Sequence, residues 1–311
     1  MQLCFLYPGE GAQYPGMGKD LYEASPAVKE LFELASDACK KDTQALLFDS
    51  DETDLKETKN TQIAITLMNL AVRRYLLENK VESAGAAGFS LGEWSAYVDA
   101  GVISEEQVFP VVLERGRLMA EASETLKAEG IQSGMAAVIG LPSEQVEGVL
   151  SNIEGAFPAN YNSTDQTVIS GNADAIEKAT MLLKEAGARR VIPLKVSGPF
   201  HTPLLLQAGS SFENYLSEIT LNDPLKPIYS NVTGGLLHSA TDVRTNAVLQ
   251  ISSPVQWTRE EAEIGSSRYD MCIETGPGKV LTGLWKKTGQ SIECKPTNTK
   301  EKIDEILGDI K

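Results

Sequence analysis

The sequence predicts an α/β protein in which a larger unit, built on a parallel sheet, carries a smaller inserted domain. Three observations support this prediction. The chain opens with a strand, a glycine-rich loop and a helix; a serine between two glycines stands at a second junction of strand and helix; and strands and helices alternate in the middle of the chain. With 311 residues, 42% of them apolar, the chain can fill one large core or two modest ones.

The N-terminal elements follow from hydrophobic spacing. Residues 2–7 are expected to form a short apolar strand that ends in the loop PGEGAQYPGMG. Ser25 and Pro26 then indicate a helix start, and a second helix is expected from about 62 to 78. The segment SAGAAG at 83–88 has poor strand propensity, but small residues suit a central parallel strand covered by helices on two faces, so a strand is expected there.

The middle of the chain predicts the small domain. The segments MAAVIGL, GAFPANYNS, QTVISG and RRVIPLKV are typical of strands, and PSEQVEGVLSNI and NADAIEKATMLLKEAG are typical of helices. Their β-α-β-β-α-β order is the ferredoxin-like pattern. We therefore expect a ferredoxin-like insert over 131–198, within a larger unit formed by 1–130 and 199–311. Strands near 228–232 and 271–274 and helices near 204–217 and 278–287 are expected to complete the larger unit.

Composition excludes several classes of function. The chain has 28 Lys and Arg against 43 Asp and Glu, a formal charge of −15, which argues against a nucleic-acid partner. Four cysteines form no CxxC pair, the N-terminus has no basic region, and no apolar run approaches eighteen residues. We expect a cytoplasmic protein with no membrane partner. Two histidines in the whole chain exclude a histidine-rich metal site.

The strongest local motif is the GxSxG sequence at 88–92, with Ser90 at its centre. It stands where the expected strand turns into a helix, which is the context of a nucleophile elbow and predicts an α/β-hydrolase-like core. The glycines permit the tight turn, and the free N–H groups of the helix start could stabilise an oxyanion.

A serine nucleophile needs a base, and His201 in SGPFHTP is the better of two candidates. It lies where the chain returns from the insert to the larger unit, although a histidine that merely starts a helix would look similar. His238 in TGGLLHSATD is typical of a turn. The two glycine-rich loops lack the third glycine of a dinucleotide fingerprint and the spacing of a P-loop, so NAD and ATP are not expected.

At this point the chain resembles the malonyl-CoA:acyl carrier protein transacylases, a family of acyltransferases in fatty acid and polyketide synthesis. The resemblance covers nearly the whole chain. It is carried by nine motifs in the family's order and at its spacings: PGEGAQYPGMG, TQIAI, GFSLGE, ERGRLM, NYNSTDQTVISG, SGPFHTP, YSNVTG, SPVQW and ETGPGKVLTGL.

The resemblance implies a role for each matching residue. Ser90 would carry the malonyl group as an ester and His201 would act as general base and acid. A backbone carbonyl would orient the histidine, and the matching position is Gln256. The backbone N–H groups of Glu10 and Leu91 would form the oxyanion hole.

The resemblance also implies a binding site for the substrate carboxylate. Arg115 would pair with it, because a planar guanidinium binds a carboxylate through two hydrogen bonds, and Arg117 is expected to be a solvated helix charge. Phe200 resembles the choice that accompanies malonyl over methylmalonyl. Polar positions of the family's cleft match Gln62, Asn160, Asn162 and Asn231, although buried amides that hold loops together would look the same.

Three positions depart from the family's usual form. Phe89 stands where histidine is common, Glu10 replaces a glutamine, and Ile63 replaces a proline. A carboxylate near the oxyanion would oppose the reaction unless it points away or pairs with a cation. The first two departures bear on rate and selectivity.

The implied reaction is malonyl transfer from malonyl-CoA, through malonyl-serine, to the phosphopantetheine thiol of holo acyl carrier protein, supplying fatty acid synthesis. No metal or organic cofactor is expected, since coenzyme A enters as part of the substrate. Two alternatives stay open: an editing acyl hydrolase, and a trans-acting malonyltransferase of a polyketide or malonate-decarboxylase system. An acidic carrier would need a local basic patch, for which Lys286, Lys287, Arg189 and Arg190 are candidates.

Overall fold

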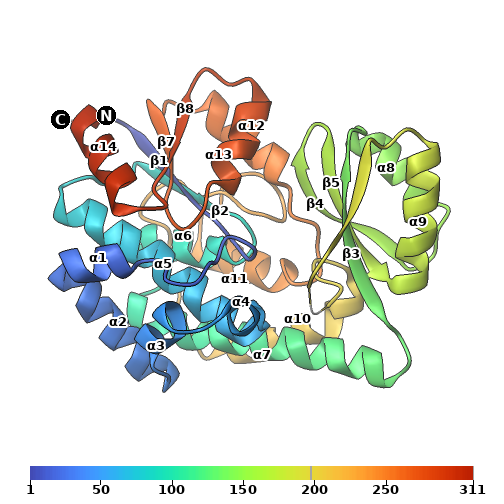
Figure 1. Cartoon of the computed structure of the whole chain (residues 1–311), viewed down its shortest axis with the longest axis horizontal. Helices are drawn as coiled ribbons and strands as arrows, with labels where there is room; N and C mark the ends of the chain where they lie inside the picture. The colour runs from blue at the N-terminus through green and yellow to red at the C-terminus, as the bar shows by residue number, and fades with distance from the viewer. Residues whose placement is uncertain (197, 311) are drawn as a thin grey trace.

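The computed structural model describes residues 1–196 and 198–310 and has a mixed α/β architecture with two separate sheets (Figure 1). Position 197, the first residue of SGPFHTP, and position 311 lie outside the described residues. Within the described ranges, no helix is both long enough and apolar enough to cross a membrane.

The first sheet has four strands, all parallel, in the order β2-β1-β7-β8. The central strand β1 is completely buried, as expected of a parallel strand covered on two faces. The edge strand β8 was not expected from the sequence. The strands are β1 (Leu3–Tyr7), β2 (Gly85–Gly88), β7 (Met271–Glu274) and β8 (Glu293–Pro296).

The strand expected near 228–232 is wrong. Only an isolated bridge joins Ile228 to Ala86 of β2, and Tyr229 then bridges back to Leu236. The chain cannot continue along the sheet because it turns at once, with the N–H of Gly234 donating to the carbonyl of Ser230 at 2.7 Å. A tight turn therefore replaces the fifth strand, and it brings Asn231 beneath β2.

Helices pack on the two faces of the parallel sheet. The longest, α7, runs along the base of the molecule toward the second sheet, and α14 lies beside the N-terminus (Figure 1). The helices of this unit are α1 (Lys19–Ala24), α2 (Pro26–Cys39), α3 (Thr43–Phe48), α4 (Glu52–Lys56), α5 (Thr58–Glu78), α6 (Gly92–Asp99), α7 (Glu105–Ala128), α10 (Leu206–Ser217), α11 (Ala240–Leu249), α12 (Trp257–Ser266), α13 (Val280–Trp285) and α14 (Lys300–Ile310), with 3-10 turns η1 (Pro203–Leu205) and η2 (Lys286–Thr288).

The second sheet is antiparallel, with the order β4-β5-β3-β6. Successive side chains along its strands point to opposite faces of the sheet, and each face packs in a different apolar environment. Ala136 and Val138 of β3 pack with α8 and α9, whereas Met135 and Ala137 belong to the core shared with the larger unit. The elements are β3 (Ser133–Ile139), α8 (Ser143–Leu150), β4 (Ala156–Ser163), β5 (Gln166–Asn172), α9 (Ala173–Glu185) and β6 (Arg190–Leu194).

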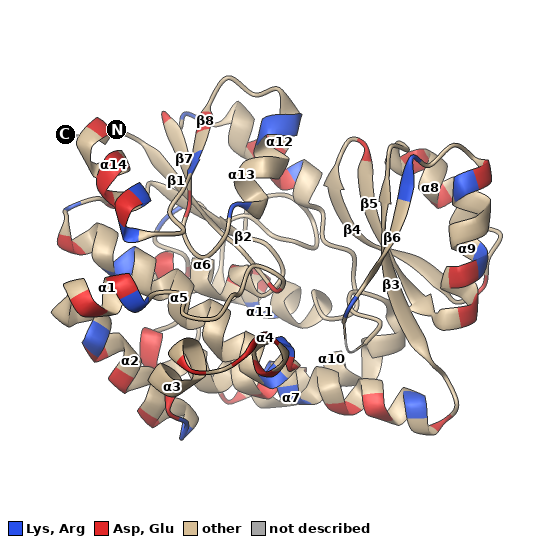
Figure 2. Ribbon diagram, viewed as in Figure 1, with Lys and Arg blue, Asp and Glu red and all other residues tan. Residues whose placement is uncertain are grey.

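The two units are joined by backbone as well as by side chains. Tyr161 of β4 donates its N–H to the carbonyl of Val255, and the N–H of Val255 donates to Ala159, each at 2.9 Å. These bonds hold the segment before α12 against the antiparallel sheet. Most charged residues lie on the helices, and the strands of both sheets are mostly uncharged (Figure 2).

Candidate active site

The turn between β2 and α6 has the backbone of a nucleophile elbow. Ser90 has φ of 50°, a left-handed conformation that is costly for a residue with a Cβ. A Cβ added to Gly88 would lie 2.2 Å from the carbonyl carbon of Gly92, and one added to Gly92 would lie 2.0 Å from the carbonyl oxygen of Tyr7. Both glycines of the motif are therefore required by close backbone contact, and the turn points Ser90 out of the sheet.

Asn231 holds this elbow from below. Its Oδ1 accepts from the N–H of Ser90 at 2.6 Å, and its Nδ2 donates to the carbonyl of Gly88 at 2.6 Å and to Glu260 Oε1 at 2.9 Å. The side chain is completely buried and does not line the cavity described below. Of the two explanations open for this residue, the structure favours an amide that holds the elbow together.

Ser90 and His201 lie in hydrogen-bond contact. Ser90 Oγ is 2.8 Å from His201 Nε2, and His201 Nδ1 is 2.8 Å from the backbone carbonyl of Gln250. Because a carbonyl only accepts, Nδ1 carries the proton and Nε2 can accept the proton of Ser90. Burial, followed by the charge of Arg115, lowers the pKa of His201 to about 4, so the imidazole is neutral at physiological pH. This geometry is that of a serine nucleophile with its base.

The expectation that Gln256 orients the histidine is wrong. The carbonyl of Gln256 accepts from the N–H groups of Arg259 and Glu260 and so begins α12. Gln250 caps the C-terminus of α11, where carbonyls have no partner within the helix. Its carbonyl is therefore available to His201, and Gln250 is a site residue that the sequence reasoning missed.

Arg115 is buried, with 1% of its surface exposed, and comes from the middle of α7. Its Nη1 donates to Gln62 Oε1 at 3.0 Å and its Nη2 to Gln250 Oε1 at 2.9 Å, while its Nε has no partner among the described residues. Burial lowers its pKa to about 10, which still leaves it charged at neutral pH. Gln62 thus positions the guanidinium and does not line the cavity. Arg117 is exposed and pairs with Glu114 and Glu121, as expected of a solvated helix charge.

A cavity of about 290 Å³ connects these groups. Ser90, His201 and Arg115 form one wall, and the antiparallel sheet forms the other. Asn160, Asn162 and Phe200, which the sequence analysis predicted to belong to the substrate cleft, line this cavity. The remaining lining is mostly apolar and comes from Glu10, Gly11, Phe89, Met119, Met135, Ala137, Gln166, Val168, Leu194, Val196, Val280 and Leu284.

Two backbone donors lie where the N-terminal loop meets the elbow. A Cβ added to Gly9 would lie 2.3 Å from the carbonyl oxygen of Phe89 and 3.6 Å from the nitrogen of Leu91, so the N-terminal loop packs directly on the elbow. The N–H groups of Glu10 and Leu91 have no acceptor within the described part of the chain. Both donors are therefore free beside the elbow.

Serine, neutral histidine, buried arginine and N–H groups without acceptors among the described residues thus lie together at one cavity. The family model described as an acyl transferase domain matches residues 4–310. The chain belongs to this acyl transferase family.

Relatives of this acyl transferase span its whole length. A malonyl CoA-acyl carrier protein transacylase of Bacillus subtilis (strain 168) is 36% identical over 314 residues, covering 100% of this chain and 98% of the relative. The crystal structure of MCAT from Streptococcus pneumoniae has a TM-score of 0.93 and 34% identity, covering 99% and 100% of the two chains. A malonyl-transacylase in complex with its type II PKS acyl-carrier protein has a TM-score of 0.94 and 33% identity, covering 99% and 100%.

Phe89 packs into the acyl transferase core beside the nucleophile. Its ring lies 5.4 Å from that of Trp257 in an edge-to-face contact, and it also lines the cavity. Phe89 therefore gives the cavity an apolar surface next to Ser90. Phe89, one of the three departures from the family's usual form, thus belongs both to the core and to the cavity lining.

The basic residues expected to dock a carrier are partly neutralised in this acyl transferase. Asp165 lies 3.2 Å from Lys287 and 3.4 Å from Arg189, and so links η2 to the antiparallel sheet. Lys286 makes no ion pair with the described residues and is exposed. Of the four candidate basic residues, Lys287 and Arg189 both form ion pairs with Asp165.

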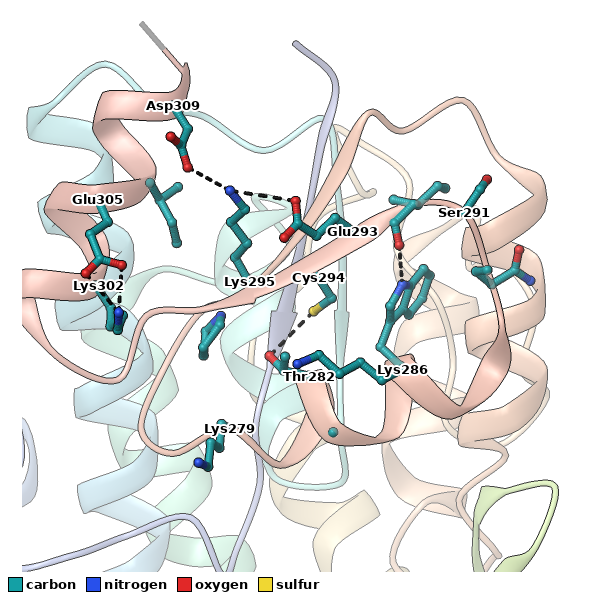
Figure 3. A pocket seen from close by; sticks show the side chains of 16 residues that line it. Lys279, Thr282, Lys286, Ser291, Glu293, Cys294, Lys295, Lys302, Glu305 and Asp309 are labelled. Carbon is teal, nitrogen blue, oxygen red and sulfur yellow. Dashed lines mark hydrogen bonds and ion pairs between the residues drawn. The ribbon is translucent and has the colours of Figure 1, made fainter.

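A larger groove of about 800 Å³ lies elsewhere, between α13, β8 and α14 (Figure 3). None of the predicted catalytic or substrate-cleft residues lines it, although Lys286, a candidate for carrier docking, does. Lys295 and Lys302, which project into it, are paired with Asp309 and Glu305. No serine–histidine contact lies among the described residues that line this groove, whereas Ser90 and His201 both line the smaller cavity.

Proposed function

We propose that this acyl transferase moves the malonyl group of malonyl-CoA to the phosphopantetheine thiol of acyl carrier protein through a malonyl ester on Ser90. The observation that carries the proposal is the contact of 2.8 Å between Ser90 Oγ and His201 Nε2 in a cavity that a buried arginine also lines. The names of the transacylase relatives support the donor and the acceptor.

In the first half-reaction, His201 Nε2 takes the proton of Ser90 as Oγ attacks the thioester carbonyl. The N–H groups of Glu10 and Leu91 would hydrogen-bond the oxygen on which negative charge develops. The carbon–sulfur bond then breaks, and the CoA thiolate leaves with the proton held by His201. The Gln250 carbonyl keeps the imidazole oriented and supports the imidazolium that forms transiently.

In the second half-reaction, the carrier thiol occupies the place of coenzyme A. His201 takes the thiol proton, sulfur attacks the ester carbonyl, and the proton returns to Ser90 as the carbon–oxygen bond breaks. Arg115 would pair with the malonyl carboxylate throughout, because a buried guanidinium without a carboxylate partner favours an acyl group that carries one. The groups that these steps use belong to the chain, to the thioester donor and to the carrier thiol, with coenzyme A entering as part of the donor.

We propose that residues 131–198 form a ferredoxin-like insert in an α/β-hydrolase-like larger unit of residues 1–130 and 199–311. The strand order β4-β5-β3-β6, with α8 and α9 on one face, supports the first assignment. The strand–elbow–helix arrangement around Ser90 supports the second.

Intact-protein mass measured after brief mixing with malonyl-CoA tests the reaction. The wild type is expected to gain one malonyl group and to lose it to added holo acyl carrier protein. Ser90→Ala should gain none, and Arg115→Ala should load malonyl poorly. Arg117→Ala is the matched control on the same helix and should load normally. An adduct that appears on Ser90→Ala, or that is released to water before the carrier removes it, would contradict the proposal.

A further inference from the structure

Glu10 shares the catalytic cavity with Ser90 and Arg115. It belongs to the loop that follows β1, and its side chain is half-buried. Among the described residues that line the cavity, Glu10, Arg115 and His201 are the ionisable ones, apart from the serine nucleophile itself. One potential anion and one cation therefore share a space of about 290 Å³.

The elements around Glu10 contribute few other charges. Helix α7 supplies Arg115, the segment before η1 supplies His201, and α13 supplies the apolar side chains Val280 and Leu284. The antiparallel sheet lines the cavity with no charged residue in its described part. Beneath the elbow, the fully buried Glu93 accepts from the N–H of Asn231 and from the side chain of Gln250. Glu10 is thus the carboxyl group that shares the lining with the guanidinium.

Burial raises the pKa of Glu10 to about 7, and the charge of Arg115 lowers it. Both protonation states are therefore populated near neutral pH. Ionised Glu10 would offset part of the charge of Arg115 across the empty cavity, although the two side chains form no ion pair among the described residues, where Arg115 donates to Gln62 and Gln250. A malonyl carboxylate brought to Arg115 would then be a second anion beside one cation, and an uncompensated charge is costly in a poorly solvated space. Protonation of Glu10 removes this cost.

We propose that Glu10 is a specificity-determining residue for the transfer proposed above: its carboxylate competes with the malonyl carboxylate for Arg115, so that malonyl binds together with one proton. The inference rests on the proposed function. It predicts that selection of malonyl over an uncharged acyl group depends on pH. This pH dependence should come from Glu10, which forms no covalent bond with the acyl group. The proton comes from solvent and stays on the Glu10 carboxyl while malonyl occupies the site.

The test measures second-order rates of Ser90 acylation by malonyl-CoA and by acetyl-CoA between pH 6 and 8.5, followed by intact mass. Because both donors carry the same coenzyme A, its own titration cancels in the malonyl-to-acetyl ratio. If only the protonated form of Glu10 admits malonyl, the ratio should fall about tenfold for each pH unit well above the pKa, and about tenfold from pH 6 to pH 8 for a pKa of about 7. The pKa of His201 is about 4, so the base does not titrate in this range.

Glu10→Gln keeps the shape of the side chain and removes its charge. This variant should show a ratio that does not change with pH and that equals the wild-type ratio at pH 6. Glu114→Gln is the matched control, since Glu114 lies on α7 next to Arg115 but pairs with the exposed Arg117. It should keep the wild-type pH dependence.

Three results would overturn the inference: a wild-type ratio that is flat with pH, a Glu10→Gln ratio that still falls, or parallel loss of malonyl and acetyl loading as pH rises. The last would mean that Glu10 acts on the shared oxyanion and not through Arg115. In each of these cases Ser90 still becomes acylated. Failure of the proposed function is different, because then no malonyl adduct that depends on Ser90 forms at any pH.

Discussion

Gln250 contacts the base, the buried cation and the backbone of the nucleophile. Its backbone carbonyl lies against His201, its Oε1 accepts from Arg115 at 2.9 Å, and its Nε2 donates to the carbonyl of Ser90 at 2.9 Å and to Glu93. The main chain of one residue thus orients the base, and its side chain positions the cation and the elbow. A substitution can separate the two roles, because it leaves the main-chain carbonyl in place.

Gln250→Ala is expected to raise KM for malonyl-CoA about tenfold and to lower kcat less. Loss of a hydrogen bond to a buried charge costs about 1.5–3 kcal/mol, while the bond from His201 to the carbonyl persists. The pH profile of acetyl loading should stay unchanged. Steady-state kinetics and the pH profile measure this, with Gln256→Ala as the control, which should behave as wild type. A larger fall in kcat than rise in KM would contradict the assignment.

Side-chain chemistry made part of this site predictable from the sequence. Ser90 and His201 stand in recognisable contexts, and the structure brings them together. A backbone carbonyl has no signature of its own, since every residue carries one. Gln250 could have been suspected only from its place at the end of a helix, where carbonyls need partners, and that end was not predicted.

At the scale of elements, the elbow depends on contact between backbones. Gly92 begins α6 against the last residue of β1, and Gly9 brings the N-terminal loop onto the same turn. Strand, loop and helix therefore fix the position of the nucleophile together. The sequence predicted this junction because glycines on both sides of a serine indicate a turn that is too tight for residues with a Cβ.

Gly92→Ala is expected to lower the free energy of unfolding by at least about 2 kcal/mol, because the added methyl would lie 2.0 Å from the carbonyl oxygen of Tyr7 and the backbone must shift. Acylation of Ser90 should fall with it. Denaturant unfolding and malonyl loading measure the two effects. Gly283→Ala is the control: Gly283 is exposed on α13 with nothing within 4 Å, so alanine there should be neutral or stabilise the helix by up to about 1 kcal/mol. Equal stability of the two variants would contradict the steric argument.

The structure of two other segments could not be predicted from the hydrophobic pattern of the sequence. Strand β8 is four residues long and carries two charged residues at its exposed edge, so no run of apolar residues marks it. The segment 228–232 begins with apolar residues, as a strand would, but it then turns so that Asn231 can hydrogen-bond the elbow. In both places, tertiary contacts outweigh local preference.

At the scale of the whole molecule, the acidic composition extends into the core. Glu93, Glu260, Glu261 and Glu274 are all buried, and burial raises the pKa of each. A group whose pKa is raised on folding binds more protons in the folded chain than in the unfolded one. The stability it contributes is present below its ordinary pKa and is lost as pH rises toward the folded pKa. The protein is therefore expected to lose stability between pH 5 and pH 8.

Glu261 offers the clearest test, because its pKa rises from 4.5 to about 8 and it has one side-chain partner, Trp257 Nε1 at 2.9 Å. Glu261→Gln keeps an oxygen for that bond and removes the titration. Its Tm should fall less than that of the wild type from pH 5 to pH 8, since each unit of pKa shift corresponds to about 1.4 kcal/mol. Thermal unfolding across that range, with the exposed Glu263→Gln as control, measures the difference. Parallel curves for Glu261→Gln and wild type would contradict the expectation.

The cavity lies between the elbow side of the larger unit and the antiparallel sheet, whose inner face shares the larger unit's core. Under the proposed function, the groups that make and break bonds come from the larger unit, while Met135, Ala137 and Val168 of the antiparallel sheet line the cavity beside them. Substitutions on those strands can therefore enlarge or narrow the range of accepted acyl groups without touching the nucleophile or its base. A lineage of such enzymes could diversify its products by altering one piece of chain while selection keeps the other constant.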